Sequence, residues 1–150
     1  MPKLTVQLWN VDKSLAKFVE KGRLQASDRD AALDRLKTTT SLDQLADADY
    51  IVEAIVENAP AKTALFTSLD AIVPNDAILS SNTSSISITM LGAATKRPDK
   101  VLGMHFMNPV PLMTLVELIR GQGTSPESMA TASKPPTTPA SSPTASCCRC

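Results

Sequence analysis

The sequence has few aromatic residues and no excess of either charge, and both absences narrow the functions that the chain can serve. Aromatic residues make up 3% of its 150 residues, so aliphatic side chains must supply most of the core. The 15 basic and 15 acidic residues give a formal net charge of zero. A nucleic acid is therefore not expected as a partner, because neutralising phosphates requires a cationic surface.

Long apolar runs and targeting signals are also missing. No run of about twenty apolar residues occurs, so we expect no membrane span and no membrane partner. Residues 1–6 lack the apolar stretch of a signal peptide. We expect a soluble, intracellular protein, cytoplasmic by default, with mitochondria and peroxisomes left open. Three thiols alone do not complete a tetrahedral zinc site, so no metal is expected at the three cysteines, Cys147, Cys148 and Cys150.

Short apolar runs alternate with helical patterns from residue 50 onward, which is typical of parallel β-α-β units. The pattern predicts strands over residues 50–56, 77–79, 101–106 and 114–119, and helices over residues 60–73 and 88–94. Before this region it predicts helices over residues 11–21, 27–36 and 41–48. Gly22 is expected to stop the first of these helices, and Ser27 with Asp30 resembles a capping box for the second.

The composition changes after about residue 124, where Ser, Thr, Pro and Ala dominate. Such a segment buries too little apolar surface to offset the entropy that ordering it would cost. We therefore expect one partial α/β domain over residues 1–123, followed by a disordered tail over residues 124–150.

Polar residues follow the ends of three predicted strands: Glu57, Asn82 and His105. In an open parallel sheet, ligands gather at the carboxyl ends of the strands. His105 is the only histidine in the sequence, and Glu117 lies in the next predicted strand. An imidazole with a buried acid beside it can transfer protons at neutral pH. Taken alone, a single histidine on an apolar strand is as readily a structural residue.

Three motifs together resemble the active-site signatures of the L-3-hydroxyacyl-CoA dehydrogenase family. They are V-E-A-I-V-E-N at residues 52–58, S-N-T-S-S-I at residues 81–86 and G-M-H-F-M-N-P-V-P-L-M at residues 103–113. The resemblance implies a Rossmann-like parallel sheet. It also implies that NAD serves as cofactor in interconverting 3-hydroxyacyl-CoA and 3-ketoacyl-CoA, a reaction of fatty acid β-oxidation.

The resemblance assigns catalytic roles to three residues. His105 is expected to be the general base, Glu117 to orient its ring, and Ser84 to bond the 3-oxygen of the substrate and help to seat the cofactor. A hydroxyl suits both oxidation states, because it donates to a ketone and accepts from an alcohol. Without the resemblance, the hydroxyls around Ser84 would be read as caps of the next helix.

Further residues match positions that bind NAD or coenzyme A in the family. Glu57, Lys62 and Asn108 are expected near the nicotinamide end of NAD. Ser14 and Lys21 are expected to contact coenzyme A, and the alternative for Lys21 is a solvated helix face. For Asn108 the alternative is to cap the turn before a proline.

Two features of the family are not found in the sequence. The family begins with a strand, a G-x-G-x-x-G turn, a helix and a second strand that ends in an acid, but no such turn is formed by the five glycines, Gly22, Gly92, Gly103, Gly121 and Gly123. That turn is needed for close approach to the pyrophosphate, and without the acid NAD and NADP are not distinguished. The family also continues into a helical domain that makes its dimer contact, for which the sequence has no match.

The expected fold is therefore an incomplete Rossmann-like sheet that lacks its first β-α-β unit. We predict that the 150-residue chain binds NAD poorly and turns over acetoacetyl-CoA negligibly. One alternative is a non-catalytic fragment that retains part of the CoA and NAD sites as an interaction module. Another is a different 3-hydroxy-acid dehydrogenase on the same scaffold.

Overall fold

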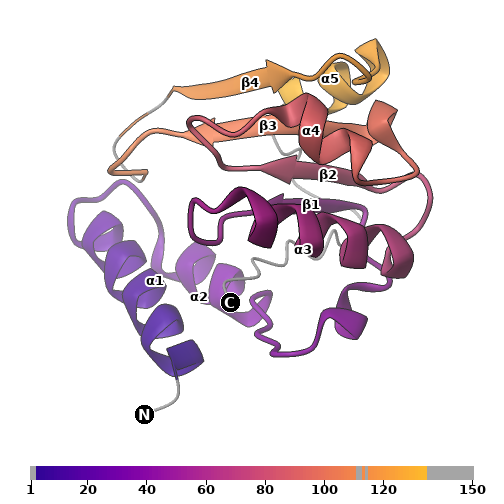
Figure 1. Cartoon of the computed structure of the whole chain (residues 1–150). Helices are drawn as coiled ribbons and strands as arrows, with labels where there is room; N and C mark the ends of the chain where they lie inside the picture. Colours follow the sequence, from indigo (N-terminus) through magenta and orange to yellow (C-terminus); the bar gives the residue numbers. More distant parts are fainter. Residues whose placement is uncertain (1–2, 111–112, 114, 135–150) are drawn as a thin grey trace. The chain divides into compact units, whose positions relative to one another are not determined.

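The computed structural model describes residues 3–110, 113 and 115–134 (Figure 1). The chain divides into two compact units, residues 1–39 and residues 40–150. Within the described residues, no helix combines the length and the apolar character needed to cross a membrane.

The first unit holds two helices, α1 (Lys3–Glu20) and α2 (Ala26–Asp34). Helix α1 begins eight residues earlier than the sequence predicts and stops at Gly22 as expected. Gly22 has a positive φ of 66°, and the amides of Gly22 and Arg23 bond back to carbonyls of the last turn, which is a Schellman motif. The predicted capping box is wrong, because α2 begins before Ser27 and its N-cap residue, Gln25, makes no side-chain capping bond.

The second unit is built on a four-stranded sheet in the order β1-β2-β3-β4. The strands are β1 (Tyr50–Glu53), β2 (Ile78–Ser81), β3 (Val101–Phe106) and β4 (Val116–Arg120). The first three run parallel, and β4 runs antiparallel to β3. A short 3₁₀ helix, η1 (Leu42–Leu45), stands where the sequence predicts a third helix.

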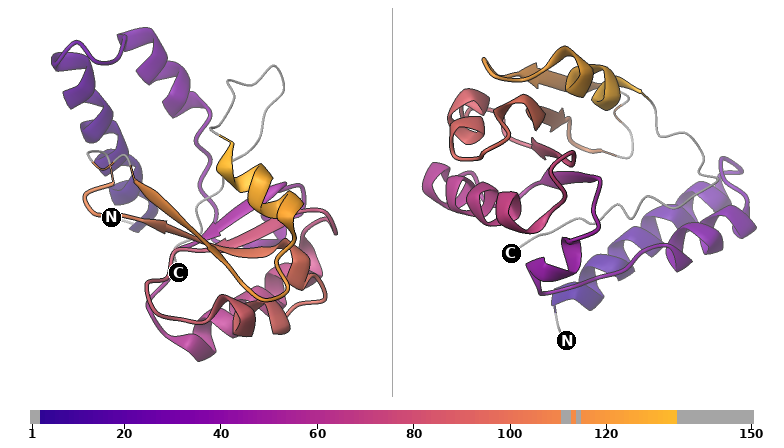
Figure 2. Two further views of the ribbon diagram at one scale, coloured as in Figure 1. Left: turned by 90° about the horizontal axis from the view of Figure 1, so that it is seen from above. Right: turned by 90° about the vertical axis from the view of Figure 1, so that its right-hand side faces the viewer.

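Helix α3 (Ala59–Ile72) connects β1 to β2, and helix α4 (Ile88–Ala93) connects β2 to a 3₁₀ turn, η2 (Pro98–Lys100), that leads into β3. Figures 1 and 2 show α3 and α4 on the same face of the sheet. Helix α3 begins where the side chain of Asn58 accepts a hydrogen bond from the amide of Ala61, at 2.9 Å, with a proline in its first turn.

Aliphatic side chains fill the space between the helices and the sheet, as the low aromatic content requires. Phe66 is the one aromatic residue among the buried hydrophobic residues of the described chain. The main cluster contains Leu45, Ala48, Ile51, Leu65, Phe66, Leu69, Val73, Ala77, Leu79, Ile88, Leu91 and Val101. This core includes residues of β1, β2 and β3, so the packing that holds these strands also positions the residues that follow their carboxyl ends.

The expectation that the chain is disordered from residue 124 is wrong for residues 124–133. Helix α5 (Pro126–Ser133) follows β4, and Ser125 caps it by accepting a bond from the amide of Ser128 at 3.1 Å. The segment is tied down by Thr124, which is 2% exposed and donates its hydroxyl to the carbonyl of Val101. Polar bonds and a cap thus replace the apolar surface whose shortage predicted disorder. Residues 135–150, including the three cysteines, lie outside the described part of the chain.

Candidate active site

His105 and Glu117 face each other across β3 and β4. They are direct partners in the register of the antiparallel pair, so their side chains emerge on the same face. The Nδ1 atom of His105 lies 2.9 Å from Oε2 of Glu117. The side chain of Glu117 is 51% exposed, so the expectation of a buried acid is wrong. The reason is its position on β4, which ends the sheet.

A pocket of about 370 Å³ opens beside this pair. One wall is the segment from Thr83 to Thr89, which leaves the end of β2 and enters α4, and the other includes His105, Glu117, Ile119 and Arg120. Ser84 is exposed and lines the pocket. The three residues predicted to be catalytic, from three separate segments, therefore share one concave site.

Asn82 fixes the end of β3 relative to the end of β2. Its side-chain oxygen accepts a hydrogen bond from the amide of Phe106 at 3.0 Å, directly after His105. The backbone amide of Asn82 donates to the carbonyl of Glu53 at 2.7 Å. The convergence of polar residues at the strand ends, predicted from the sequence, is thus observed, although the bridging role of Asn82 was not predicted.

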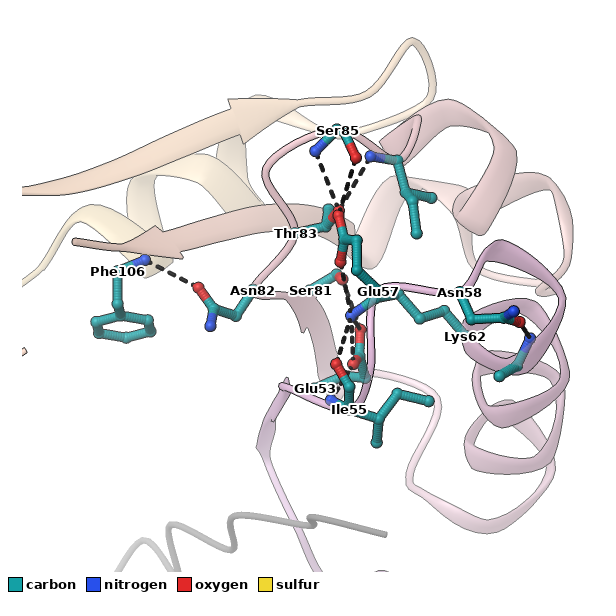
Figure 3. A network of polar contacts seen from close by, with 12 residues as sticks. Glu53, Ile55, Glu57, Asn58, Lys62, Ser81, Asn82, Thr83, Ser85 and Phe106 are labelled. Carbon is teal, nitrogen blue, oxygen red and sulfur yellow. Dashed lines mark hydrogen bonds and ion pairs between the residues drawn. The ribbon is translucent and has the colours of Figure 1, made fainter. Parts of the chain in front are cut away.

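Glu57 contacts the serine-rich loop (residues 82–87) that follows β2 rather than standing alone at the edge of the sheet. Its Oε1 atom accepts hydrogen bonds from the hydroxyls of Thr83 and Ser85 (Figure 3). Partial desolvation raises the pKa of Glu57, but the bonds from Thr83 and Ser85 and the nearby ammonium group of Lys62 outweigh it, and the pKa lies below its ordinary value of 4.5. Glu57 is therefore ionised at neutral pH.

Lys62 lies underneath Glu57 and is completely buried. Its Nζ atom lies 2.6 and 2.9 Å from the two carboxylate oxygens of Glu53 and 3.5 Å from Oε2 of Glu57. The carboxylate of Glu53 also accepts bonds from the amide of Ile55 and the hydroxyl of Ser81, both at 2.6 Å. All polar atoms of this buried group are paired, as a buried charge requires.

The sequence reasoning missed Glu53, although a signal was present. Glu53 is the one charged residue inside the apolar run from Tyr50 to Val56. A carboxylate that a strand carries into the core needs a cation within reach, and Lys62 in the first turns of the next helix is the nearest candidate along the chain.

Three further residues were predicted to bind NAD or coenzyme A. Asn108 is exposed in the connection between β3 and β4. Ser14 is half-buried on α1, and Lys21 is exposed just beyond its end. Both belong to the first unit, and their contact with coenzyme A stays a prediction.

Comparison with known proteins places these features in a family. The sequence profile described as the NAD-binding domain of 3-hydroxyacyl-CoA dehydrogenase matches residues 3–135. A probable 3-hydroxybutyryl-CoA dehydrogenase of Deinococcus radiodurans is 54% identical over 117 residues, which are 78% of this chain and 42% of that protein. A protein of the same description from Bacillus subtilis is 48% identical over 120 residues, which are 80% of this chain and 42% of the relative.

The structural neighbours agree. The crystal structure of 3-hydroxybutyryl-CoA dehydrogenase from Escherichia coli K12 superposes with a TM-score of 0.83 and 39% identity, over 85% of this chain and 27% of that one. The chain spans about two fifths of the length of the Deinococcus and Bacillus relatives.

Proposed function

Because the chain belongs to the 3-hydroxyacyl-CoA dehydrogenase family, we propose that its pocket holds the reacting end of a 3-hydroxyacyl-CoA during oxidation to the 3-ketoacyl-CoA. The observation that carries the proposal is the shared pocket of His105, Glu117 and Ser84. Relatives bear the name 3-hydroxybutyryl-CoA dehydrogenase, so a four-carbon acyl group is the first to test.

His105 acts as the general base in this proposal. The carboxylate of Glu117 accepts a hydrogen bond, so Nδ1 carries the proton of the neutral ring and Nε2 keeps a lone pair. Nε2 takes the proton of the 3-hydroxyl, and NAD, when bound, would accept the hydride from carbon 3 of the acyl group. In the reducing direction, the protonated ring returns the proton to the oxygen.

Ser84 supplies the hydrogen bond to the reacting oxygen. Among the described residues its hydroxyl has no hydrogen-bond partner, so it is available to a ligand. Ser14 and Lys21 are proposed to contact coenzyme A, for which a cationic helix face suits the phosphates.

The described residues fit the nicotinamide half of NAD and not the pyrophosphate half. Glu57, Ser84 and Asn108 are exposed at or near the carboxyl edge of the sheet, where a dinucleotide lies in open α/β folds. The ammonium group of Lys62 is buried, so Lys62 is proposed to contribute to the cofactor site through its contact with Glu57. No G-x-G-x-x-G turn, which would cradle the pyrophosphate, occurs in the 150 residues.

Isothermal titration of the 150-residue chain with acetoacetyl-CoA tests this proposal. We expect measurable binding, weakened roughly tenfold in Ser84→Ala because a hydrogen bond to the 3-oxygen is lost. Ser68→Ala, the same change at an exposed serine on α3, is the control and is expected to bind like the unaltered chain. Binding that does not depend on Ser84 would contradict the proposed site.

The same preparation is assayed for oxidation of NADH by acetoacetyl-CoA. Turnover is expected to be negligible, because positioning the nicotinamide supplies roughly 7–11 kcal/mol of the catalytic effect and the pyrophosphate cradle is needed for it. Robust turnover that His105→Ala abolishes would overturn the expectation that the 150-residue chain positions NAD poorly. It would also argue against a non-catalytic interaction module.

A further inference from the structure

We propose that Glu57 is a positioning residue for Ser84, acting through the two neighbours of Ser84 in the serine-rich loop (residues 82–87). This inference rests on the proposed function, in which Ser84 bonds the 3-oxygen of the acyl group. It adds a link between the connection from β1 to α3, which carries Glu57, and the substrate side of the pocket.

The contacts of Glu57 bracket Ser84. Its Oε1 atom accepts the hydroxyl of Thr83 on one side and the hydroxyl of Ser85, at 3.1 Å, on the other (Figure 3). The Thr83 oxygen accepts the amides of Ser85, at 3.3 Å, and Ile86, at 3.0 Å. Ser84 itself contributes no bond to this arrangement, so its backbone is held from both sides while the residue lines the pocket.

The two oxygens of Glu57 serve different partners. Oε1 receives the hydroxyls, and Oε2 lies 3.5 Å from Nζ of Lys62. Lys62 cannot move away from this position without breaking its pair with Glu53, whose exposure is 1%. The buried pair is therefore a fixed support for an otherwise exposed carboxylate.

The charge state of Glu57 suits this role. A carboxylate offers acceptor sites only, so Oε1 can receive both hydroxyls while Oε2 faces Lys62, whereas a carboxamide would direct a donor group either at the two hydroxyls or at the ammonium group of Lys62. The lowered pKa of Glu57 keeps it ionised throughout the neutral range.

Hydrogen–deuterium exchange of the ligand-free 150-residue chain tests whether Glu57 orders the loop. In Glu57→Gln, we expect the exchange rates of the Ser85 and Ile86 amides to rise roughly tenfold or more. Both amides donate to the hydroxyl oxygen of Thr83, and the substitution weakens the hydrogen bond that holds this hydroxyl in place. Thr83→Val removes the hydroxyl and should produce the same rise. Thr83→Ser keeps the hydroxyl and should exchange as slowly as the unaltered chain. Glu127→Gln, at an exposed glutamate on α5, is the matched control. Unchanged exchange in Glu57→Gln would overturn the proposal.

A double-mutant cycle with acetoacetyl-CoA tests whether this order reaches the ligand. Glu57→Gln is expected to weaken binding roughly tenfold in the unaltered chain and less than about twofold in a Ser84→Ala background. A loss of equal size in both backgrounds would show that Glu57 does not act through Ser84 and would reject the proposal. Binding unaffected by Ser84→Ala would instead reject the proposed function, with the exchange experiment still deciding whether Glu57 orders the loop.

Discussion

Replacing Lys62 with methionine is expected to lower the free energy of unfolding of the second unit by about 3–5 kcal/mol. Methionine fills a similar volume, so the loss comes from the carboxylate of Glu53, which would remain 1% exposed without its cation. The amide of Ile55 and the hydroxyl of Ser81 bond this carboxylate but do not neutralise its charge. Native-state hydrogen exchange of the β2 amides measures the change, because β2 lies inside the sheet of this unit.

Two further variants separate a lost charge pair from a general packing defect. Lys96→Met removes an exposed lysine from the same unit and should change the unfolding free energy by less than about 0.5 kcal/mol. The double replacement Glu53→Gln with Lys62→Met removes both charges and should recover part of the loss. Equal losses in the single and double variants would show that the pairing of charges is not what stabilises the site.

Arg97→Met is expected to destabilise the second unit by a similar amount, about 3–5 kcal/mol. Arg97 is 6% exposed and closes the end of α3. Its Nε atom donates to Asp70 at 2.7 Å, and its terminal nitrogens donate to the carbonyls of Asp70, Val73 and Pro74. Removing the guanidinium group takes one donor from each of three carbonyls and leaves the nearly buried carboxylate of Asp70 with the backbone amide of Lys96 as its donor and no cation.

Arg97→Lys is the informative companion to this variant. Lysine keeps the charge but lacks the planar fork that reaches the carboxylate and the carbonyls together, so an intermediate loss is expected. The same exchange measurement applies, with Lys96→Met at the neighbouring position as control. A loss in Arg97→Lys as small as that of the control would show that the charge alone, rather than the geometry of the fork, holds the end of α3.

The strands and helices of the second unit were largely predictable because their apolar runs are bounded by residues with clear local effects. Asn58 and Pro60 start α3 where the sequence predicts a helix, and β3 has the predicted bounds of residues 101–106. The α5 helix was missed because its order comes from a cap and from the buried hydroxyl of Thr124, which composition does not reveal. The division of the chain into two units was likewise not expected from its length.

The candidate site was predictable only in part. The pairing of His105 with Glu117 follows from an antiparallel return of the chain, and the motif around the single histidine pointed to it. The roles of Thr83 and Asn82 could not be read from the sequence, because they depend on which strand ends become neighbours in the sheet, whereas Glu53 was marked by its place inside an apolar run. The exposure of Glu117 was misjudged for the same reason, since nothing in the sequence marks β4 as the last strand of the sheet.

The single histidine allows a direct test of the central claim. The claim is that Glu117 holds the ring of His105 so that an unprotonated Nε2 faces a bound 3-ketoacyl-CoA. A long-range ¹H–¹⁵N correlation spectrum of the 150-residue chain shows one imidazole, which needs no assignment. At a pH where the ring is neutral, we predict a proton on Nδ1, a mixture of tautomers in Glu117→Gln, and a shift of the Nε2 signal when acetoacetyl-CoA is added. A proton on Nε2, or signals that acetoacetyl-CoA leaves unmoved, would contradict the account.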